Sequence, residues 1–379
     1  MRALINGNYA VSYAMMQINP DVCASYPITP QTQIIETFSK YVADGKVTTE
    51  NILAESEHSA MSACIGASAA GARVFTATAS QGLAYMIEVI YIAAGLRLPM
   101  TMVVGNRGIG APLLLHCDYS DSFLARDSGW IQIYCKDVQE VYDTTLMAVK
   151  ITEETKIPVM VMMDGFYTTH GEQVIDTLST KQAVNFVGKK PKWPNMLDSK
   201  ITFGNVSLTD SNIEVRERQW RDLANSSKSI LGIQKGFEKF SKRNYGLYES
   251  YGLKDANTVF VTMGSSYQAI ELTCQELRKK GKKVGCLRPR VYRPFPYNEL
   301  RAELKGKKII VLDRAISHGA EFGPMGLEFQ GMGREFYNVV YGIGGRDFGL
   351  EEAKDLVGKF LKGKQKKFQF YGLRKDLKN

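Results

Sequence analysis

The sequence has few cysteines and no pattern that would turn them into metal ligands or disulfides. Its six cysteines are dispersed through 379 residues, none belongs to a C-x-x-C pair, and most lie in apolar surroundings. This argues against a disulfide framework, a zinc site or an iron–sulfur cluster held by this chain, and predicts buried thiols in a reducing compartment. The sequence also lacks a signal peptide and any apolar run of the roughly 18 residues that span a membrane. We therefore expect a cytoplasmic protein without membrane contact.

Acidic residues are the minority charge. The chain has 39 Asp and Glu against 48 Lys and Arg, which gives a net charge of +9. The lysine runs lack interleaved aromatic residues, apart from Phe360 and Phe368 near the end of the chain. We expect a solvated surface, or one that suits an acidic partner protein, and no nucleic-acid binding.

The first 165 residues alternate apolar segments with amphipathic ones. The first helix is expected to begin at Gly7-Asn8. Apolar strands separated by helices indicate a parallel sheet covered on both faces. The predicted helices cover Thr32–Tyr41, Ser56–Gly71, Leu83–Ala94 and Asp137–Thr155, and the predicted strands cover Val22–Ser25, Val74–Thr78, Pro99–Gly105 and Pro158–Met163.

The second half predicts a linking segment and then another α/β unit. From Gly171 to about Gly252 the pattern is weak, and we expect one helix, Ile213–Glu238, lying against the first domain. We therefore predict an α/β protein with a first domain at residues 1–240, its linking segment starting near 171, and a second parallel-sheet domain at 250–379. The strands of the second domain are predicted at Thr258–Met263, Val284–Leu287, Ile309–Leu312 and Val339–Tyr341, and its helices at Tyr267–Lys280 and Leu350–Leu361.

Three clusters of polar residues follow predicted strands of the first domain. Thr29 lies in a stiff turn between two prolines, Glu57 opens a predicted helix, and Arg107 follows a strand end. Strand ends of open α/β sheets are where ligands bind. A buried carboxylate such as Glu57 is costly unless it is paired, and the alternative is that it only caps its helix. A guanidinium suits bidentate capture of a carboxylate, and the alternative for Arg107 is a salt bridge with Asp118 or Asp121.

Other motifs are weaker. There is no recognisable Ser/His/Asp arrangement and no metal-ligand spacing, so we predict no metal site in this chain. Gly264-Ser265-Ser266 could hold a phosphate at a helix N-terminus. Gly342-Ile343-Gly344-Gly345 follows a strand but lacks the full dinucleotide fingerprint, which disfavours a nucleotide-binding dehydrogenase.

Ordered motifs across most of the chain resemble one family, the alpha subunit of the 2-oxoacid:ferredoxin oxidoreductases, and most closely that of the pyruvate:ferredoxin oxidoreductases. The segments from 174 to 253 and the last thirty or so residues are too generic to match. The motifs are Tyr26-Pro27-Ile28-Thr29-Pro30, Glu55-Ser56-Glu57-His58-Ser59-Ala60, Thr76-Ala77-Thr78-Ala79-Ser80-Gln81-Gly82, Asp127-Ser128-Gly129-Trp130, Val291-Tyr292-Arg293-Pro294-Phe295-Pro296, Val311-Leu312-Asp313-Arg314 and Tyr341-Gly342-Ile343-Gly344-Gly345-Arg346-Asp347.

The resemblance implies a thiamine diphosphate pyrimidine-binding domain followed by a domain of the transketolase C-terminal type. It assigns Glu57 to the aminopyrimidine ring, Thr29 to the substrate and Arg107 to the 2-oxoacid carboxylate. Cofactor contacts are expected from Glu57 and from two loops, at Pro27 and Ile28 and at Ser80 and Gln81. The implied reaction is reversible oxidative decarboxylation of pyruvate with coenzyme A, giving acetyl-CoA and CO2, in anaerobic metabolism.

The resemblance also implies partners. Thiamine diphosphate would be shared with a beta subunit, Mg²⁺ and the iron–sulfur clusters would lie in partner subunits, and gamma and delta subunits would complete the complex that reduces ferredoxin. Three alternatives stay open: the same chemistry on 2-oxoglutarate, a branched-chain 2-oxoacid or oxalate; a non-catalytic scaffold subunit; and a nucleotide-binding dehydrogenase.

Overall fold

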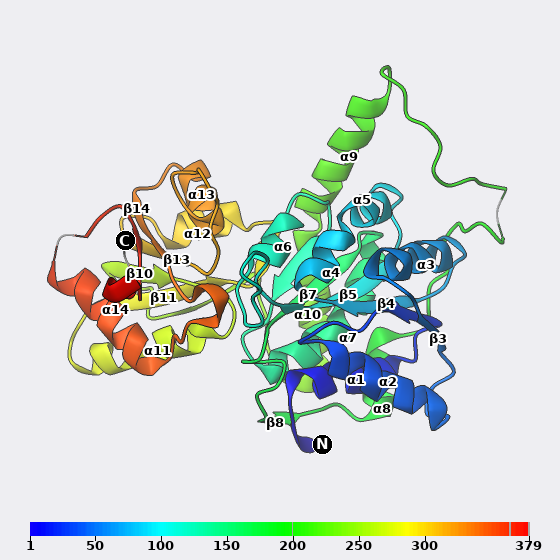
Figure 1. The fold of residues 1–379 in the computed structure, drawn as a ribbon, viewed down its shortest axis with the longest axis horizontal. Coiled ribbons are helices and arrows are strands. Elements are labelled where there is room, and N and C mark those ends of the chain that lie inside the picture. The colour runs from blue at the N-terminus through cyan, green and yellow to red at the C-terminus, as the bar shows by residue number, and fades with distance from the viewer. Residues whose placement is uncertain (199, 364, 378–379) are drawn as a thin grey trace.

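The computed structural model describes residues 1–377 except 199 and 364, and it shows two sheets with their own helices (Figure 1). Within these residues the larger sheet has seven strands in the order β12-β6-β7-β5-β4-β2-β3. Six of the seven are parallel, and β12 joins β6 in antiparallel direction at one edge. The strands are β2 (Val22–Ser25), β3 (Glu50–Leu53), β4 (Val74–Thr78), β5 (Met100–Asn106), β6 (Ile131–Tyr134), β7 (Val159–Asp164) and β12 (Val291–Arg293).

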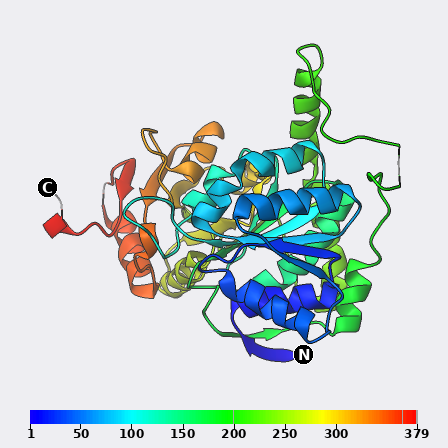
Figure 2. The ribbon, with the colours of Figure 1, turned by 45° about the vertical axis from the view of Figure 1, so that its right-hand side comes forward.

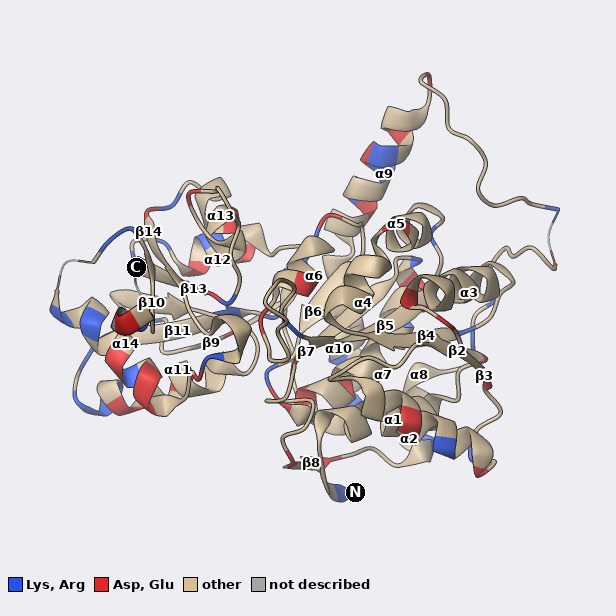
Figure 3. Cartoon of the chain, viewed as in Figure 1, with Lys and Arg blue, Asp and Glu red and all other residues tan. Residues whose placement is uncertain are grey.

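Helices cover both faces of this sheet, which explains why β4, β5 and β7 are buried along their whole length. Figure 3 shows the consequence: these strands are almost free of charged residues, whereas the helices around them carry both signs. One face packs on α1 (Gly7–Ile18), α2 (Thr32–Ala43), α7 (Val138–Thr155), α8 (Thr180–Val187) and α10 (Ser227–Ser241); the other packs on α3 (Glu57–Ala69), α4 (Ser80–Tyr85), α5 (Ile87–Gly95) and α6 (Ser120–Leu124). A separate antiparallel pair joins β1 (Arg2–Ile5) to β8 (Gln173–Asp176).

The second sheet has the order β15-β14-β13-β10-β11-β9 over the described part of the chain. Its strands are parallel except β9, which pairs antiparallel with β11. The strands are β9 (Tyr248–Tyr251), β10 (Thr258–Val261), β11 (Val284–Pro289), β13 (Lys308–Asp313), β14 (Phe336–Val340) and β15 (Phe368–Phe370), and the helices are α11 (Ser266–Lys279), α12 (Tyr297–Glu303), α13 (Pro324–Gly331), α14 (Leu350–Lys362) and the short 3₁₀ turns η1 (Ile343–Gly345) and η2 (Lys375–Leu377).

The structure corrects four expectations. The single helix expected at 213–238 is two helices, α9 (Asn212–Asn225) and α10, which meet at Ser226. The linking segment also contains β8 and α8, which were not predicted. Residues 83–94 likewise form two helices, α4 and α5, with Met86 between them. The sheets are not purely parallel, because β12 and β9 add antiparallel edge strands.

Only part of the linking segment lies against the first sheet. Ile230, Ile233 and Phe237 of α10 are buried in the core beside α7 and α8, as expected. In contrast α9 has no buried residue in the described chain and extends away from the rest of the molecule (Figures 1 and 2). The sequence was therefore sufficient to predict helical structure here, but the prediction that the whole helix lies against the first domain holds only for α10.

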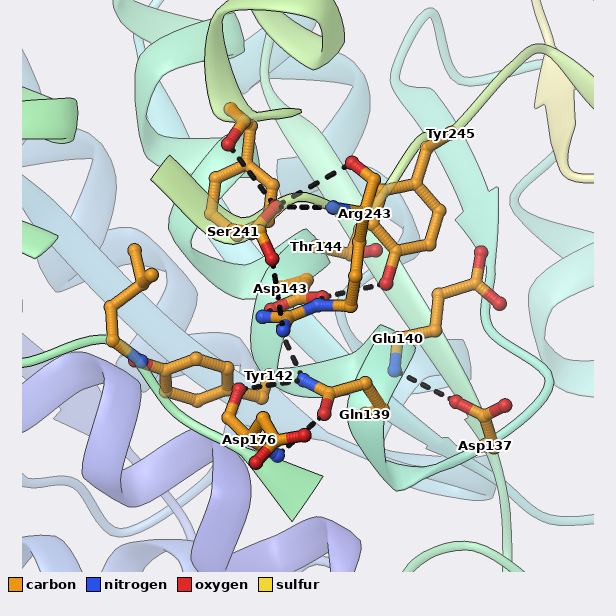
Figure 4. Close-up of polar contacts among 12 residues, drawn as sticks. Asp137, Gln139, Glu140, Tyr142, Asp143, Thr144, Asp176, Ser241, Arg243 and Tyr245 are labelled. Atoms are coloured by element: carbon orange, nitrogen blue, oxygen red, sulfur yellow. Dashed lines mark hydrogen bonds and ion pairs between the residues drawn. The ribbon is translucent and has the colours of Figure 1, made fainter. Parts of the chain in front are cut away.

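Buried charges hold α7 against the second sheet. Glu140 accepts hydrogen bonds from Arg288 (2.7 Å) and Arg290 (2.5 Å), and each of the three side chains is only 1% exposed. Burial disfavours the charged form of Glu140, but the two guanidinium groups outweigh this and lower its pKa. The next turn of α7 carries Asp143, which Arg243 and Tyr245 contact from the segment after α10 (Figure 4).

Removing Glu140 should therefore be costly. The Glu140→Ala change leaves two buried guanidinium groups without their shared partner, and we expect the free energy of unfolding to fall by about 3–5 kcal/mol. Denaturant unfolding of the purified chain measures this. The control is Lys359→Ala, which breaks an exposed pair with Asp355 and should cost less than about 0.5 kcal/mol. Equal losses in the two variants would contradict the role given to Glu140.

Candidate active site at the carboxyl edge of the first sheet

The candidate site lies where β2, β4 and β5 end. These three strands are parallel and adjacent, so the loops that follow them meet at one edge of the sheet. The proline turn with Thr29 follows β2, the segment that opens α4 at Ser80 follows β4, and Arg107 follows β5. The predicted site residues therefore come from neighbouring loops on one edge.

Glu57 is a buried carboxylate with no partner. It is the first residue of α3 and is 8% exposed. The described residues offer its carboxylate no hydrogen bond and no ion pair. The helix cap is Ser56, whose side chain accepts a hydrogen bond from the Ser59 N–H at 3.2 Å. Glu57 is therefore not the cap, but it lies in the first turn of α3, where the helix dipole favours an anion.

Gly82 leaves room for this carboxylate. A Cβ atom at position 82 would lie 2.7 Å from Glu57 Oε1 and 2.6 Å from Thr78 Oγ1, closer than non-bonded atoms approach. The Thr78 hydroxyl is itself buried and has no hydrogen-bond partner. The end of β4 and the start of α3 thus present an unpaired carboxylate and an unpaired hydroxyl to the same small space.

Arg107 connects the loops. Its Nη1 donates to the Thr29 carbonyl at 2.8 Å, its Nη2 donates to Gln81 Oε1 at 3.0 Å, and its Nε donates to the Leu114 carbonyl at 2.8 Å. The guanidinium makes no ion pair with Asp118 or Asp121, so that alternative is wrong. Burial lowers its pKa from the ordinary value. The structure therefore brings Thr29, Gln81 and Arg107 into one hydrogen-bonded group.

Asp121 belongs to the same group and was not predicted as a site residue. It lies in α6, is fully buried, and accepts hydrogen bonds from the Ser80 and Arg107 backbone N–H groups at 3.0 Å each. Burial raises its pKa to about 6. No local sequence pattern indicates this role, because it depends on α6 folding back over the end of β5.

Unpaired buried atoms at this edge test whether a polar cofactor fits. Besides Thr78, the side chains of Ser25 at the end of β2 and Asn106 at the end of β5 each have a buried oxygen without a hydrogen-bond partner. Buried polar groups are normally paired, so the unpaired oxygens at three adjacent strand ends have hydrogen-bonding capacity left for a polar ligand; unpaired buried atoms also occur elsewhere in the described chain, as at Thr101 and Gln132. Together with Glu57 they fit an aminopyrimidine ring, which offers both donors and acceptors.

The glycine turn at 264–266 has a different role from the phosphate loop considered above. The Ser265 N–H and hydroxyl both donate to Asp164 Oδ2, at 3.1 and 2.6 Å. The carboxylate of a first-domain residue therefore binds where a phosphate was considered. Asp164 also pairs with Arg314 at 2.9 Å, and both side chains are 1% exposed. These contacts make Arg314, of the strand-end Asp313-Arg314 motif, part of the junction between the two sheets, whereas Asp313 accepts hydrogen bonds within the second domain, from Met325, Gly326 and Asn338.

Comparisons with known proteins identify the family of the chain. Residues 13–235 match the family described as pyruvate flavodoxin/ferredoxin oxidoreductase, thiamine diphosphate-binding, and residues 256–353 match the pyruvate:ferredoxin oxidoreductase core domain II. Pyruvate synthase subunit PorA of Thermotoga maritima is 44% identical, over 93% of each chain. Ketoisovalerate oxidoreductase subunit VorA of Pyrococcus abyssi is 37% identical, over 94% of this chain and 93% of its own.

Two solved structures are similar in fold. The 2-oxoglutarate:ferredoxin oxidoreductase of Magnetococcus marinus, with 2-oxoglutarate, coenzyme A and succinyl-CoA bound, has a TM-score of 0.75 at 22% identity; the alignment covers 94% of this chain and 65% of that one. A split-gene transketolase, an inactive β4 tetramer, has a TM-score of 0.54 at 14% identity, over 94% of this chain and 97% of that one.

The fold is an α/β fold similar to that of a transketolase, and the family match makes this a protein with a thiamine diphosphate-binding domain, as the sequence predicted. The chain belongs to the pyruvate flavodoxin/ferredoxin oxidoreductase family. Its first domain is the thiamine diphosphate-binding domain of that family. Among the described residues, no helix is long and apolar enough to cross a membrane.

A methyl group at position 82 should disturb the site more than the fold. Gly82→Ala would push the Glu57 carboxylate aside, because the end of that side chain is more mobile than Thr78, and we expect the affinity for thiamine diphosphate to fall by about 10–100-fold. Titration of the cofactor into the cofactor-free native protein measures this. Gly66→Ala in α3 is the matched control, since its Cβ would meet open space. Unchanged affinity in Gly82→Ala would contradict the assignment.

Proposed function

We propose that this chain is the alpha subunit of a multisubunit pyruvate:ferredoxin oxidoreductase. The reaction is the reversible oxidative decarboxylation of pyruvate with coenzyme A to acetyl-CoA and CO2, with electrons passing to ferredoxin. The observation that carries the proposal is the unpaired Glu57 carboxylate next to the Arg107 group at one sheet edge. Relatives that are 44% identical and named as a pyruvate synthase subunit support the choice of substrate.

Glu57 is proposed to hold the aminopyrimidine of the cofactor and to exchange a proton with it through its carboxylate. Bound thiamine diphosphate supplies the nucleophilic carbon that a 2-oxoacid needs for loss of CO2. A carboxylate serves this purpose when it is within hydrogen-bond reach and not already paired inside the protein. Glu57 meets the second condition. Its contact with the segment that opens α4, at Gly82, supports the first, because Ser80 and Gln81 of that segment are expected to contact the cofactor.

Arg107 is proposed to bind the carboxylate of the 2-oxoacid. A guanidinium has five N–H groups. Three of those in Arg107 are used within the chain, by Thr29, Gln81 and Leu114, and two remain, one on each terminal nitrogen. Those two can take one carboxylate in a bidentate pair. Thr29 is exposed and its hydroxyl is proposed to contact the substrate from the same loop that Arg107 fixes.

The cofactor is proposed to lie between this chain and a beta subunit. Pro27, Ile28, Ser80 and Gln81 would line it on this side, as part of a domain at residues 1–240, with a transketolase C-terminal-like domain at 250–379. Large apolar side chains are exposed on the loops and helices that follow the strand ends, and they suit burial by a partner: Leu53, Tyr85, Leu113 and Leu115.

The other components are assigned to partners. Mg²⁺, the diphosphate site and the iron–sulfur clusters are proposed for the beta, gamma and delta subunits, with ferredoxin as acceptor and coenzyme A as co-substrate. All six cysteines of this chain are free and buried, which supports a reducing cytoplasmic location and a structural role for the thiols.

A second candidate is the same chemistry on a branched-chain 2-oxoacid. The VorA relative is named as a ketoisovalerate oxidoreductase and matches nearly the whole chain at 37% identity. The intact Thr29, Glu57 and Arg107 disfavour a non-catalytic scaffold. The native complex, purified anaerobically and assayed with coenzyme A and an artificial electron acceptor, should turn over pyruvate with a higher kcat/KM than 2-oxoglutarate, 2-oxoisovalerate or oxalate. A preference for 2-oxoisovalerate would favour the second candidate, and no turnover of any 2-oxoacid would contradict the function.

Replacing the acid–base group should leave an assembled but slow enzyme. Glu57→Gln keeps the size of the side chain but cannot exchange a proton, and we expect kcat to fall by about 10²–10⁴-fold. Steady-state assays of the reconstituted complex measure this. Glu55→Gln is the control: that carboxylate is exposed two residues earlier and bonds only the Ser59 hydroxyl, at 2.7 Å. Wild-type turnover in Glu57→Gln would remove Glu57 from the proposed role.

A further inference from the structure

One carboxylate oxygen joins two loops of the candidate site. Oδ2 of Asp121 accepts from the Ser80 N–H at 3.0 Å and from the Arg107 N–H at 3.0 Å. Its other oxygen accepts from Asn106 Nδ2 at 2.8 Å and from the Ser122 N–H at 2.7 Å. Asp121 is 0% exposed and contributes no atom to the surface.

The contacts close into a ring. The Ser80 hydroxyl directs its single proton toward two acceptors, Gln81 Oε1 and the Gly108 carbonyl (2.8 Å for the latter). Gln81 Oε1 also accepts from Arg107 Nη2, and the Arg107 N–H donates to Asp121. Ser80 has a φ of +49°, a left-handed conformation that costs energy for a residue with a Cβ atom. The ring therefore holds in place a backbone conformation that the chain would not adopt alone.

We propose that Asp121 is a positioning residue for the reaction: it fixes the loops after β4 and β5 relative to each other and thereby aims the Arg107 guanidinium. The inference rests on the proposed function, because Arg107 is the group assigned to the substrate. Through the bond from Arg107 to the Thr29 carbonyl, the same carboxylate also determines where the proline turn after β2 lies.

A carboxylate is required here, not merely a polar side chain. Four N–H groups converge on two oxygens, two on each. An asparagine offers one acceptor oxygen, so in either orientation its NH2 group would face two N–H donors. Asp121→Asn should therefore lose either the two ring contacts, with the Ser80 and Arg107 N–H groups, or the two contacts with Asn106 and Ser122 that hold the carboxylate in place, while leaving the size of the side chain unchanged.

The test compares Asp121→Asn with a matched buried acid in the native complex. Asp143 of α7 is also 0% exposed, accepts from Arg243 (2.5 and 2.7 Å) and from Tyr245 (2.6 Å), and is not part of the hydrogen-bonded site (Figure 4). We expect Asp121→Asn to raise KM for the 2-oxoacid about 10–100-fold with a smaller change in kcat. Asp143→Asn should leave KM unchanged, whatever it does to the melting temperature.

A double-mutant cycle shows whether Asp121 acts through Arg107. In an Arg107→Ala background, most of the KM effect of Asp121→Asn should be absent, because the group that it aims is gone. Full additivity of the two changes would overturn the proposal, and so would a wild-type KM in Asp121→Asn or an equal rise in KM in Asp143→Asn.

Hydrogen exchange of the full chain gives a readout independent of turnover. Asp121→Asn should speed exchange in peptides that contain the Ser80 and Arg107 amides, while Asp143→Asn should not. If the wild-type complex turns over no 2-oxoacid, the proposed function fails, whereas the exchange result still decides whether Asp121 holds the loops. Unchanged exchange at both amides would overturn the positioning role.

Discussion

The proposed role of the first domain depends on one constraint: the Glu57 carboxylate is buried and has no hydrogen-bond or ion-pair partner among the described residues. A buried carboxylate normally costs several kcal/mol unless hydrogen bonds or a cation compensate it. Glu57 has no hydrogen bond and no nearby cation partner among the described residues, although only 8% of it is exposed, at the start of α3. The absence of a side chain at position 82 leaves room for the carboxylate, which lies beside the unpaired hydroxyl of Thr78. Such an uncompensated group is expected at a functional site, where a ligand completes the pairing.

Two other buried acidic side chains of the first domain, unlike Glu57, are paired with basic or hydroxyl groups. Glu140 has two arginine partners, and Asp164 has Arg314 and the Tyr119 hydroxyl. These fully compensated pairs join the first sheet to the second, so the core continues from one to the other. They hold the sheet rigidly at the junction, and a rigid sheet is what allows three loops to keep fixed positions at its carboxyl edge.

Hydrophobic pattern predicted most of the fold correctly. The strands β2 and β4 have the predicted bounds, and the other predicted strands of the first sheet are shifted by about one residue, because continuous apolar runs between turn residues leave little choice. The parts of the fold that were not predicted include the break of the helix at Ser226, the strand β6 and the edge strand β12. The antiparallel pairing of β12 joins residues 291–293 to residues 132–133, and no local pattern contains such a pairing.

The candidate site shows the same division. Thr29, Glu57 and Arg107 could be found from the sequence because each follows a strand end and belongs to a motif. Asp121 could not, because its contacts join it to residues 41 and 14 positions away, at Ser80 and Arg107. The hydrogen bonds of the Arg107 guanidinium to Thr29, Gln81 and Leu114 could not be predicted from the sequence either.

The most direct test of the central claim is an experimental structure of the native complex with thiamine diphosphate bound. The account predicts that the Glu57 carboxylate lies within hydrogen-bond distance, about 2.5–3.2 Å, of a nitrogen of the aminopyrimidine ring. A ring that lies elsewhere, with Glu57 paired to another residue of the protein, would contradict it.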